Sequence, residues 1–321
     1  SEQCKILKSN FYLDSFNYFP ITKDYFTFNP LFKIQNDNSI DHFYTENFYK
    51  KLLDEEKNFK EFKNSFVLGS SPGDNYFSNL IHFLPRIFFI DQKKINIIIH
   101  RNLSNKFRDL IKSICEMRGI EIKFNFLDDN FYKFTNSLLP QFFTIEKSTK
   151  ILKYFIEKIL PDISSPNFGK KIYIRREDAH YRKILNESDL IVKLRKKNFE
   201  IVNPQHFDIL TQMKIFSNAD LIISPFGSNL SNIIFSKKGT QIIEISPNFR
   251  NAYEQNLAKR YENLSKFVNL RHSKILADTV DVSNHSVLAK KYINNNILKE
   301  SDYYKNIILK VSQIDDLINN L

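Results

Sequence analysis

The stretch DLIISPFGSNLSNIIFSKKGTQIIEIS, residues 220–246, decides the fold class of this chain. Two short apolar runs within it, DLIIS at 220–224 and TQIIEIS at 240–246, are typical of buried β-strands. Between them, PFGSNLSNIIF at 225–235 predicts a turn that leads into a short helix. Strands and helices that alternate in this way favour a parallel α/β sheet, whose ligands bind at the carboxyl ends of the strands. The turn after residue 224 is therefore a natural binding site.

The same alternation extends upstream of this stretch. KKIYIRR at 170–176 and FEIV at 199–202 predict two more strands of the same series. INIIIH at 95–100 and EIKFNFL at 121–127 predict an earlier pair of strands, which flank an amphipathic helix at 105–119. We therefore expect an α/β protein with two Rossmann-like domains, whose parallel sheets face a cleft.

A segment rich in Pro, Ser and Gly, LPDISSPNFGKK at 160–171, lies between the two series and is typical of a linker. The sequence thus predicts an N-terminal domain at 1–163 and a C-terminal Rossmann-like domain at 164–285. Residues 286–321 predict helices, for which we expect packing back on the N-terminal domain.

Composition places the chain among ordinary globular proteins, because 42% of its 321 residues are hydrophobic and 26% are charged. The 47 Lys and Arg exceed the 36 Asp and Glu, and the formal charge of +11 favours an anionic partner such as phosphate, nucleic acid or an acidic membrane face. Cys4 and Cys115 lack the spacing of metal ligands, and no D-x-D carboxylate pair is present to hold a divalent ion. We expect no metal site.

No stretch of the sequence approaches the roughly 20 apolar residues that span a bilayer, and the first residues lack an apolar signal core. These features predict a cytoplasmic protein.

Three residues of the turn, Gly227, Ser228 and Asn229, precede the short helix, where free N–H groups and the helix dipole attract an anion. The alternative is a plain turn capped by Ser or Asn. Arg176 ends a predicted strand and Arg182 follows six residues later, so both could neutralise one diphosphate. Solvated arginines are the alternative.

Three further residues could take part in catalysis or ligand binding. His82 lies in an apolar helical stretch and is a candidate general base, although a core histidine is the commoner finding there. Asp74, in the turn GSSPGDN at 69–75, is a reserve base. Glu244 lies near the end of a predicted strand, where a carboxylate either accepts from ribose hydroxyls or is simply solvated.

Taken together, KIYIRREDAHYRKILNESDL (171–190), DILTQMKIFSNA (208–219), LIISPFGSNLSNIIFSKKG (221–239) and TQIIEISP (240–247) resemble the core of glycosyltransferase family 61, and the chain looks like a bacterial member. The positions that match the motifs of that family are Arg176, Arg182, Asn186, Glu187, Gln212, Gly227, Leu230, Asn232 and Glu244. Upstream, DNYFSNLIHFLPRIFF (74–89) is similar to another element of the family and matches it at Asn75, Tyr76, Leu84, Pro85 and Arg86.

The resemblance implies a GT-B architecture and an inverting, metal-independent transfer of a sugar from a nucleotide-sugar, with a UDP-sugar favoured. It implies no cofactor beyond this donor substrate. The donor would bind the C-terminal domain through Arg176, Arg182, Asn186, Glu187, Gly227, Ser228, Asn229, Asn232 and Glu244. On the acceptor side, the family's motif implies Asn75, Tyr76 and Arg86.

Departures from the family pattern bear on the donor and on activity. Phe226 stands where the family has a histidine, Asn229 replaces a glycine, Ser78 replaces a second histidine and Thr211 replaces an acid. A catalytically degenerate protein that binds a glycan or acts as a scaffold is therefore an alternative. His82 falls where the family often carries Asp or Glu, and this makes it the first candidate for the base.

The expected acceptor is a growing surface polysaccharide, of capsule or lipopolysaccharide, or a glycolipid. The basic charge also allows peripheral association with the anionic inner face of the membrane. The same charge, with 31 Phe and 15 Tyr, suggests a nucleic-acid binder as a rival. Because the lysines are dispersed and no nucleic-acid module is visible, we expect no nucleic-acid partner.

Overall fold

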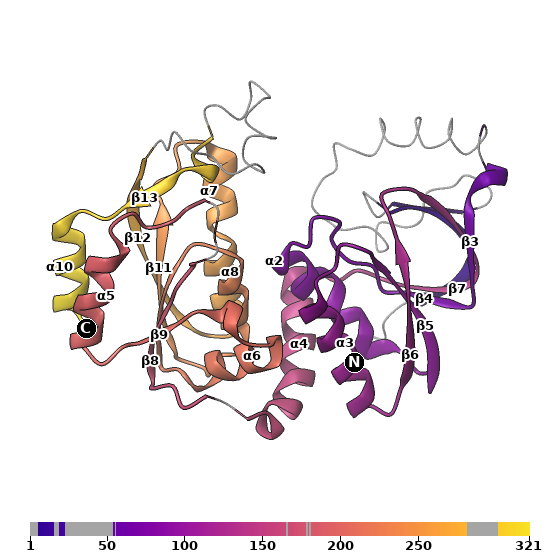
Figure 1. Ribbon diagram of the computed structural model, residues 1–321, viewed down its shortest axis with the longest axis horizontal. Helices are drawn as coiled ribbons and strands as arrows, with labels where there is room; N and C mark the ends of the chain where they lie inside the picture. Colours follow the sequence, from indigo (N-terminus) through magenta and orange to yellow (C-terminus); the bar gives the residue numbers. More distant parts are fainter. Residues whose placement is uncertain are drawn as a thin grey trace. The chain divides into compact units, whose positions relative to one another are not determined.

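The computed structural model describes residues 6–15, 19–22, 54, 56–164, 166–177, 179, 181–280 and 301–321. The chain divides into two compact units, Ser1–Phe155 and Ile156–Leu321 (Figure 1). This division falls slightly before the boundary that the sequence predicts at 163/164, and it lies within the helix α4 (Ile145–Ile159).

The first unit is built on a sheet in which three parallel strands stand side by side. These are β4 (Ser65–Val67), β5 (Lys94–His100) and β6 (Glu121–Leu127), which pair in that order. The parallel part of the prediction is confirmed here. Four further strands extend the sheet beyond β4, and these are β7 (Phe131–Pro140), β3 (Lys60–Lys63), β1 (Ile6–Asp14) and β2 (Phe19–Thr22). Of these, β1 runs antiparallel to both β7 and β2.

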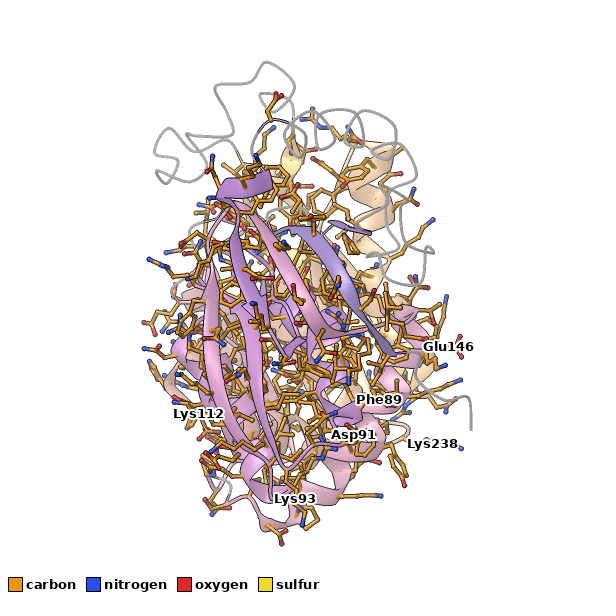
Figure 2. All side chains as sticks on the ribbon, turned by 90° about the vertical axis from the view of Figure 1, so that its right-hand side faces the viewer. Phe89, Asp91, Lys93, Lys112, Glu146 and Lys238 are labelled. Atoms are coloured by element: carbon orange, nitrogen blue, oxygen red, sulfur yellow. The ribbon has the colours of Figure 1, made fainter. Side chains whose placement is uncertain are left out.

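Helix α3 (Asn105–Met117) connects β5 to β6, as predicted. Its apolar residues recur at helical spacing, and all of them except the exposed Met117 at the end of the helix are buried: Phe107, Leu110, Ile111, Ile114 and Cys115. The helix ends before Gly119, whose φ of 67° lies in the left-handed region that glycine adopts without strain. The amino-terminal end of β5, where Asp91 and Lys93 are exposed, lies at the lower end of the sheet in Figure 2.

The segment before β5 is an interrupted helix, as its proline predicts. It begins as α2 (Tyr76–Ser78), continues as a π-helical turn (Asn79–Phe83) and ends as a 3-10 helix (Leu84–Phe89). Pro85 has no N–H to donate, so the regular α-helical ladder cannot run through it. Most of this segment is buried.

The second unit has a six-stranded sheet in the order β13-β12-β11-β10-β8-β9. The strands are β8 (Lys171–Ile174), β9 (Glu200–Val202), β10 (Leu221–Pro225), β11 (Gln241–Pro247), β12 (Arg271–Val280) and β13 (Asn306–Ile308). All neighbours run parallel except β12 and β13. In chain order the parallel strands stand as 2-1-3-4-5, which is a doubly wound arrangement whose direction reverses between β8 and β10.

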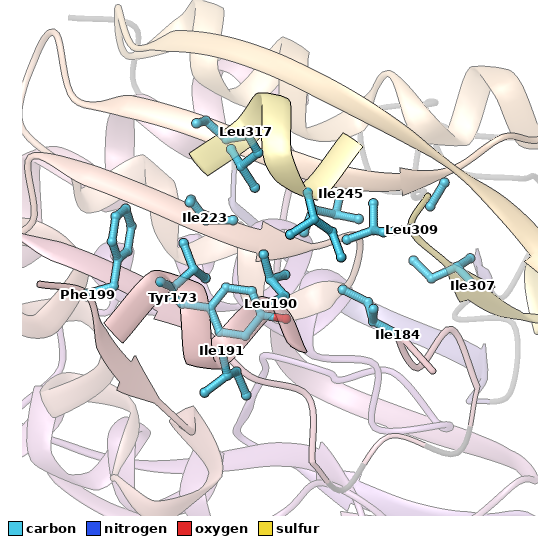
Figure 3. Close-up of a cluster of buried hydrophobic side chains, with 14 residues drawn as sticks. Tyr173, Ile184, Leu190, Ile191, Phe199, Ile223, Ile245, Ile307, Leu309 and Leu317 are labelled. Atoms are coloured by element: carbon cyan, nitrogen blue, oxygen red, sulfur yellow. The ribbon is translucent and has the colours of Figure 1, made fainter. Parts of the chain in front are cut away.

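Helices cover both faces of this second sheet (Figure 1). On one face lie α5 (Glu187–Lys196) and α10 (Val311–Asn319), and on the other lie α6 (Ile209–Asn218), α7 (Ala252–Ala258) and α8 (Arg260–Phe267). Apolar side chains such as Leu190, Ile223 and Leu317 pack together between α5, α10 and the strands (Figure 3). Burial of this kind contributes about 25 cal/mol for each Å² of apolar surface removed from water.

Residues 301–321 belong to this second unit, whereas the sequence predicted that they would pack on the N-terminal domain. The sequence also predicted helices throughout, but 306–308 form the edge strand β13, which pairs antiparallel with β12. Ile307 there is fully buried in the core beneath α5 and α10, while its neighbour Ile308 is exposed, as the alternation of a strand requires. The predicted segment at 286–300 lies outside the described residues.

Candidate functional site

The site begins where the second sheet reverses its winding direction. Arg176 lies two residues after β8, and Gly227 lies two residues after β10, the neighbouring strand. In open α/β sheets, ligands bind outside the carboxyl ends of strands at this kind of reversal. The two positions that the sequence singled out are thus neighbours in the fold.

Arg176 and Gly227 are in direct contact. The Arg176 guanidinium donates from Nη1 to the backbone oxygen of Phe226 over 3.0 Å. A Cβ at position 227 would lie 2.7 Å from Nε and 2.9 Å from Cζ of Arg176, which is too close for any real side chain. Gly227 has an extended backbone with φ 172°, so glycine is required here by the arginine rather than by the backbone conformation.

Arg182 lies beside Arg176 and is nearly inaccessible to water, at 4% exposure. Burial, reinforced by the like charge of Arg182, lowers the pKa of Arg176 to about 10, so Arg176 is still cationic at neutral pH. Among the described residues, neither arginine forms an ion pair with a carboxylate. The two guanidiniums therefore create a concentrated positive charge at the end of β8.

Three aromatic rings enclose the Arg182 guanidinium. Its Cζ lies 4.1 Å from the ring centroid of Tyr303, 4.7 Å from that of Tyr181 and 4.9 Å from that of Phe226. Such cation–π contacts stabilise a desolvated guanidinium by about 2 kcal/mol or more each. Two of its donors, Nε and Nη1, are buried without a hydrogen-bond partner. Arg182 also has φ 57°, an uncommon backbone conformation for a residue with a side chain.

Sequence reasoning missed Tyr303, which comes from the far end of the chain. Burial alone would raise the pKa of its hydroxyl, but the charge of Arg182 and a hydrogen bond from it outweigh burial and hold that pKa below its ordinary value. The backbone N–H of Arg182 donates to the carbonyl of Lys305 over 3.1 Å, and this fixes the same segment. No spacing rule joins residues so far apart in sequence, so no sequence signal could have found this contact.

The 3-10 helix that follows Gly227 (Ser228–Phe235) carries three predicted residues. Ser228 and Asn229 are half-buried in its first turn, and their side chains make no hydrogen bond with the described part of the chain. Asn232 is completely buried and donates to Gln212 Oε1 over 3.4 Å, while Gln212 donates to the carbonyl of Phe207. Asn232 therefore joins this helix to α6, whereas Ser228 and Asn229 directly follow Gly227 in the chain.

The structure uses two predicted donor residues, Asn186 and Glu187, in its own hydrogen bonds. Asn186 stands at the N-cap position of α5 but makes no capping hydrogen bond there; its amide donates to and accepts from the backbone of Leu309, over 2.8 and 3.2 Å. Glu187 accepts from Tyr173 over 2.9 Å and from Arg175 Nε over 3.1 Å. Both residues hold local structure around β8 and β13.

Glu244 lies within β11 and is completely buried, not solvated at the strand end. Its Oε2 is 3.0 Å from Nε2 of His272, and the other ring nitrogen of His272 is 2.8 Å from Ser265 Oγ. These contacts join β11, β12 and α8. The Oε1 atom of Glu244 is buried without a hydrogen-bond partner, and Lys274 Nζ lies 4.0 Å from it.

In the first unit, the two candidate bases have different settings. His82 is 6% exposed and its ring packs edge-on against Phe77, with 5.7 Å between the centroids. Asp74 is half-buried in the loop after β4 and accepts from Asn79 over 2.9 Å. Burial raises the pKa of the Asp74 carboxyl, although hydrogen bonds with Ser104 and Asn79 oppose this.

The three predicted acceptor-side residues also differ in exposure. Asn75 is exposed and caps α2 by accepting from the Ser78 N–H over 3.0 Å, while Tyr76 is half-buried against Phe107. Arg86 is completely buried and donates to the carbonyls of Val67, over 3.1 Å, and of Pro140, over 2.8 Å. Arg86 therefore joins the ends of β4 and β7 from inside the unit.

The structure thus brings together Arg176, Arg182 and Gly227 and adds Tyr181, Phe226 and Tyr303 to them. Apart from Ser228 and Asn229, the other predicted residues make separate contacts. In the described ranges, no three His, Cys, Asp or Glu side chains converge so that they could hold a metal ion. None of the helices in that part of the chain is long and apolar enough to cross a membrane.

Comparison with known proteins gives the family of this chain. No curated protein matches the chain. The model of one protein family, Glycosyltransferase 61, matches residues 42–243, which is more than half of the 321 residues. The match includes the strands β8 and β10 together with Arg176, Arg182 and Gly227. The chain therefore belongs to the glycosyltransferase 61 family.

Proposed function

We propose that this protein transfers a sugar, with inversion and without a metal ion, from a nucleotide-sugar to a hydroxyl group of a saccharide or glycolipid acceptor. The observation that carries the proposal is the pair of arginines at the reversal of the second sheet. A diphosphate is an anion, so it would balance the positive charge of Arg176 and Arg182. Its oxygens also accept hydrogen bonds from guanidinium N–H groups.

The geometry around Gly227 supports a diphosphate in particular. The missing Cβ lets the Arg176 guanidinium lie flat against the backbone of the turn, where it is held by the Phe226 carbonyl. Arg182 lies close to Arg176 and is also buried. The positive charge of the two side chains would act strongly on an anionic ligand here, because burial lowers the local dielectric constant. Ser228 and Asn229 add hydroxyl and amide groups that have no partner among the described residues.

In this mechanism the bond between the anomeric carbon and the diphosphate oxygen breaks as the acceptor oxygen attacks from the opposite face. Charge develops on the departing diphosphate, and Arg176 and Arg182 stabilise that charge in the transition state more than in the ground state. A base removes the proton of the acceptor hydroxyl. The nucleoside is proposed to be uridine, and the acceptor a surface polysaccharide or a lipid-linked saccharide.

The proposal is tested by calorimetric titration of the protein with UDP, GDP, CMP, dTDP and ADP, with and without Mg²⁺. We expect UDP to bind and Mg²⁺ to leave its affinity unchanged. Arg176→Gln should weaken UDP binding about 10- to 100-fold, because a charge-assisted hydrogen bond contributes about 1.5–3 kcal/mol. Uridine, which lacks the diphosphate, should bind both proteins equally weakly.

Arg175→Gln is the matched control. Arg175 precedes Arg176 directly, but its guanidinium is already paired with Glu177 and Glu187. This variant should keep the affinity of the wild-type protein for UDP. Equal UDP binding by Arg176→Gln and wild type would refute the diphosphate site. Binding of UDP without any release of UDP from UDP-sugars would favour the degenerate glycan-binding protein, for which Phe226 at the family's histidine position is the motivating observation.

A further inference from the structure

A carboxylate and a buried amide meet at the carboxyl ends of β8 and β9, next to the proposed diphosphate site. Glu177 directly follows Arg176, and Asn203 is the first residue after β9. Nδ2 of Asn203 donates to Oε2 of Glu177 over 3.0 Å. The backbone N–H of Arg175 donates to the carbonyl of Val202 over 2.8 Å, so the two chain segments are still paired just before this contact. The Glu177 carboxylate is therefore held at the end of β9.

The surroundings of Asn203 fix the orientation of its amide. Asn203 is 9% exposed, and its Oδ1 accepts from the backbone N–H of Gln205 over 3.3 Å. Its Nδ2 also lies 3.5 Å from Nε2 of His206. The amide oxygen therefore faces the turn that follows β9, and the amide nitrogen faces Glu177. A buried amide with one orientation fixes the carboxylate that it contacts.

The Glu177 carboxylate keeps acceptor sites for a ligand. Its side chain is 47% exposed, and an ionised carboxylate can accept about four hydrogen bonds. Asn203 donates one, and Nη1 of Arg175 donates another over 3.2 Å. The pair with Arg175 lies at the surface, where ion pairs do little to fix a side chain. The remaining acceptor sites are open to hydroxyl groups.

Three other carboxylates of the second unit are less open to a ligand. Glu244, to which the sequence pointed as an acceptor for ribose hydroxyls, is completely buried within β11 beside His272. Asp302 is also buried. Glu187 is half-buried and accepts from two side chains of its own unit. Among these four carboxylates, that of Glu177 is the one that a ligand can reach.

The topology of the sheet indicates which part of a nucleotide belongs beside Glu177. In chain order, β8 and β9 are the first two parallel strands of the second unit. In doubly wound sheets that bind dinucleotides, the phosphates lie at the turn after the first strand, and an acidic residue roughly 20 residues further on accepts from the ribose 2′-hydroxyl. Here the chain from Arg176 leads to the end of β9, where Asn203 is an amide and Glu177 supplies the carboxylate.

We propose that Glu177 accepts hydrogen bonds from the ribose hydroxyls of the donor nucleotide and that Asn203 is its positioning residue; this inference rests on the proposed function. Arg176 contacts the turn after β10, whereas Glu177 contacts the end of β9, and β8 lies between those two strands. Diphosphate and ribose are bonded neighbours in a nucleoside diphosphate, as Arg176 and Glu177 are in the chain. The site therefore selects ribonucleotide donors and rejects deoxyribonucleotide donors such as dTDP-sugars.

The test compares the calorimetric affinities of UDP, 2′-deoxy-UDP and 3′-deoxy-UDP. Wild type should bind at least one deoxy analogue about tenfold more weakly than UDP, because the carboxylate loses a hydrogen bond. In Glu177→Ala the ratio of these affinities should fall to about one. The ratio does not depend on the change in protein charge, since all three ligands carry the same diphosphate. Glu177→Gln, whose amide oxygen still accepts, should retain part of the preference.

Asn203→Ser tests the positioning role. A serine hydroxyl at this position can still cap the turn by accepting from the Gln205 N–H, but it is too short to hold Glu177. The preference for UDP over the deoxy analogue should therefore fall from about tenfold to about threefold. A merely structural role would change the thermal stability without changing this ratio. An unchanged ratio in Asn203→Ser would overturn the positioning role.

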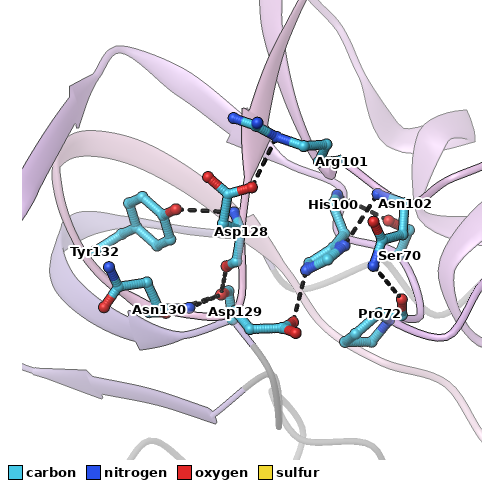
Figure 4. A network of polar contacts seen from close by, with 10 residues as sticks. Ser70, Pro72, His100, Arg101, Asn102, Asp128, Asp129, Asn130 and Tyr132 are labelled. Carbon is cyan, nitrogen blue, oxygen red and sulfur yellow. Dashed lines mark hydrogen bonds and ion pairs between the residues drawn. The ribbon is translucent and has the colours of Figure 1, made fainter.

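Asp129, in the first unit, provides the matched control. Its side chain is 53% exposed, and its Oδ1 lies 2.9 Å from Nε2 of His100, whose side chain is 4% exposed (Figure 4). The backbone N–H of Asn102 donates to Nδ1 of His100 over 3.2 Å, so a buried side chain holds this carboxylate as well. Asp129→Ala thus removes a comparable carboxylate from the unit that does not contain Arg176 or Glu177. It should keep the wild-type ratio of affinities.

The outcomes separate this inference from the proposed function. Equal binding of UDP and both deoxy analogues by wild type would overturn the inference and leave the diphosphate site intact. So would a preference for UDP that survives unchanged in Glu177→Ala, because the ribose would then be recognised elsewhere. A wild-type protein that binds none of the three ligands would refute the proposed function, and the inference with it.

Discussion

Gly227 is the residue at which a single added methyl group should damage donor binding most selectively. Its backbone is extended, so Gly227→Ala introduces no backbone strain, but the new Cβ would overlap Arg176 Nε at 2.7 Å. The guanidinium must move away from the turn. We expect the affinity for UDP to fall about tenfold or more, which is the loss of one charge-assisted hydrogen bond. Calorimetric titration measures this directly.

Gly169→Ala provides the matched control in the same unit. The nearest atom to its new Cβ would be Glu200 Cγ at 3.5 Å, an ordinary van der Waals contact. This variant should bind UDP as wild type does. If Gly227→Ala also kept the wild-type affinity, the contact between Arg176 and the turn would have no part in binding.

The residues of the candidate site could be predicted from sequence only where they lie in recognisable segments. Arg176, Arg182 and Gly227 stand at strand ends that the apolar pattern marks, so their proximity could be expected. Tyr303 could not be predicted, because its contact with Arg182 depends on how a distant segment folds back.

Among the larger elements, buried strands and amphipathic helices were predictable because their patterns are local. The strands β5, β6, β8, β10 and β11 and the helix α3 follow from apolar runs and helical spacing in the sequence. β13 was expected to be helical, because its three residues carry too little pattern and pair with β12 only through tertiary contact. Pairing partners decide such short edge strands.

Asp302 fixes the segment that carries Tyr303 to the rest of its unit. Its carboxylate accepts from Arg250 Nε and Nη2, each over 2.9 Å, and from Lys305 Nζ over 3.0 Å. Burial alone would raise the pKa of Asp302, but the hydrogen bonds from Arg250 and Lys305 outweigh it and hold the pKa well below its ordinary value. We expect Asp302→Asn to lower the free energy of unfolding at pH 7 by about 1–3 kcal/mol.

The pH dependence of this difference follows from the lowered pKa. The carboxylate's contribution is complete above the unfolded pKa of about 3.9, and it is lost as the pH falls from there toward the folded pKa. Urea unfolding of both proteins between about pH 7 and pH 3 should therefore show a constant gap down to about pH 4 and a gap that begins to narrow below it. Asp316→Asn, at an exposed position on α10, should show no gap at any pH. A gap that widened in acid would contradict this account of the ion pairs.

The division of the molecule into two units predicts that UDP alone affects one of them. The proposed diphosphate site uses only residues of the second unit, whereas His100 and Asp129 belong to the first. Hydrogen exchange measured with saturating UDP should therefore slow in peptides that contain Arg176, Gly227 or Tyr303, because a ligand suppresses local opening of the segments that it contacts.

Peptides that contain His100 or Asp129 should exchange as they do without UDP, and Arg176→Gln at the same UDP concentration should lose the protection of the second unit. Protection confined to the first unit would show that UDP binds there, and it would contradict the proposed diphosphate site in the second unit. Protection of the second unit alone would show that UDP contacts only residues of that unit, as the proposed diphosphate site requires.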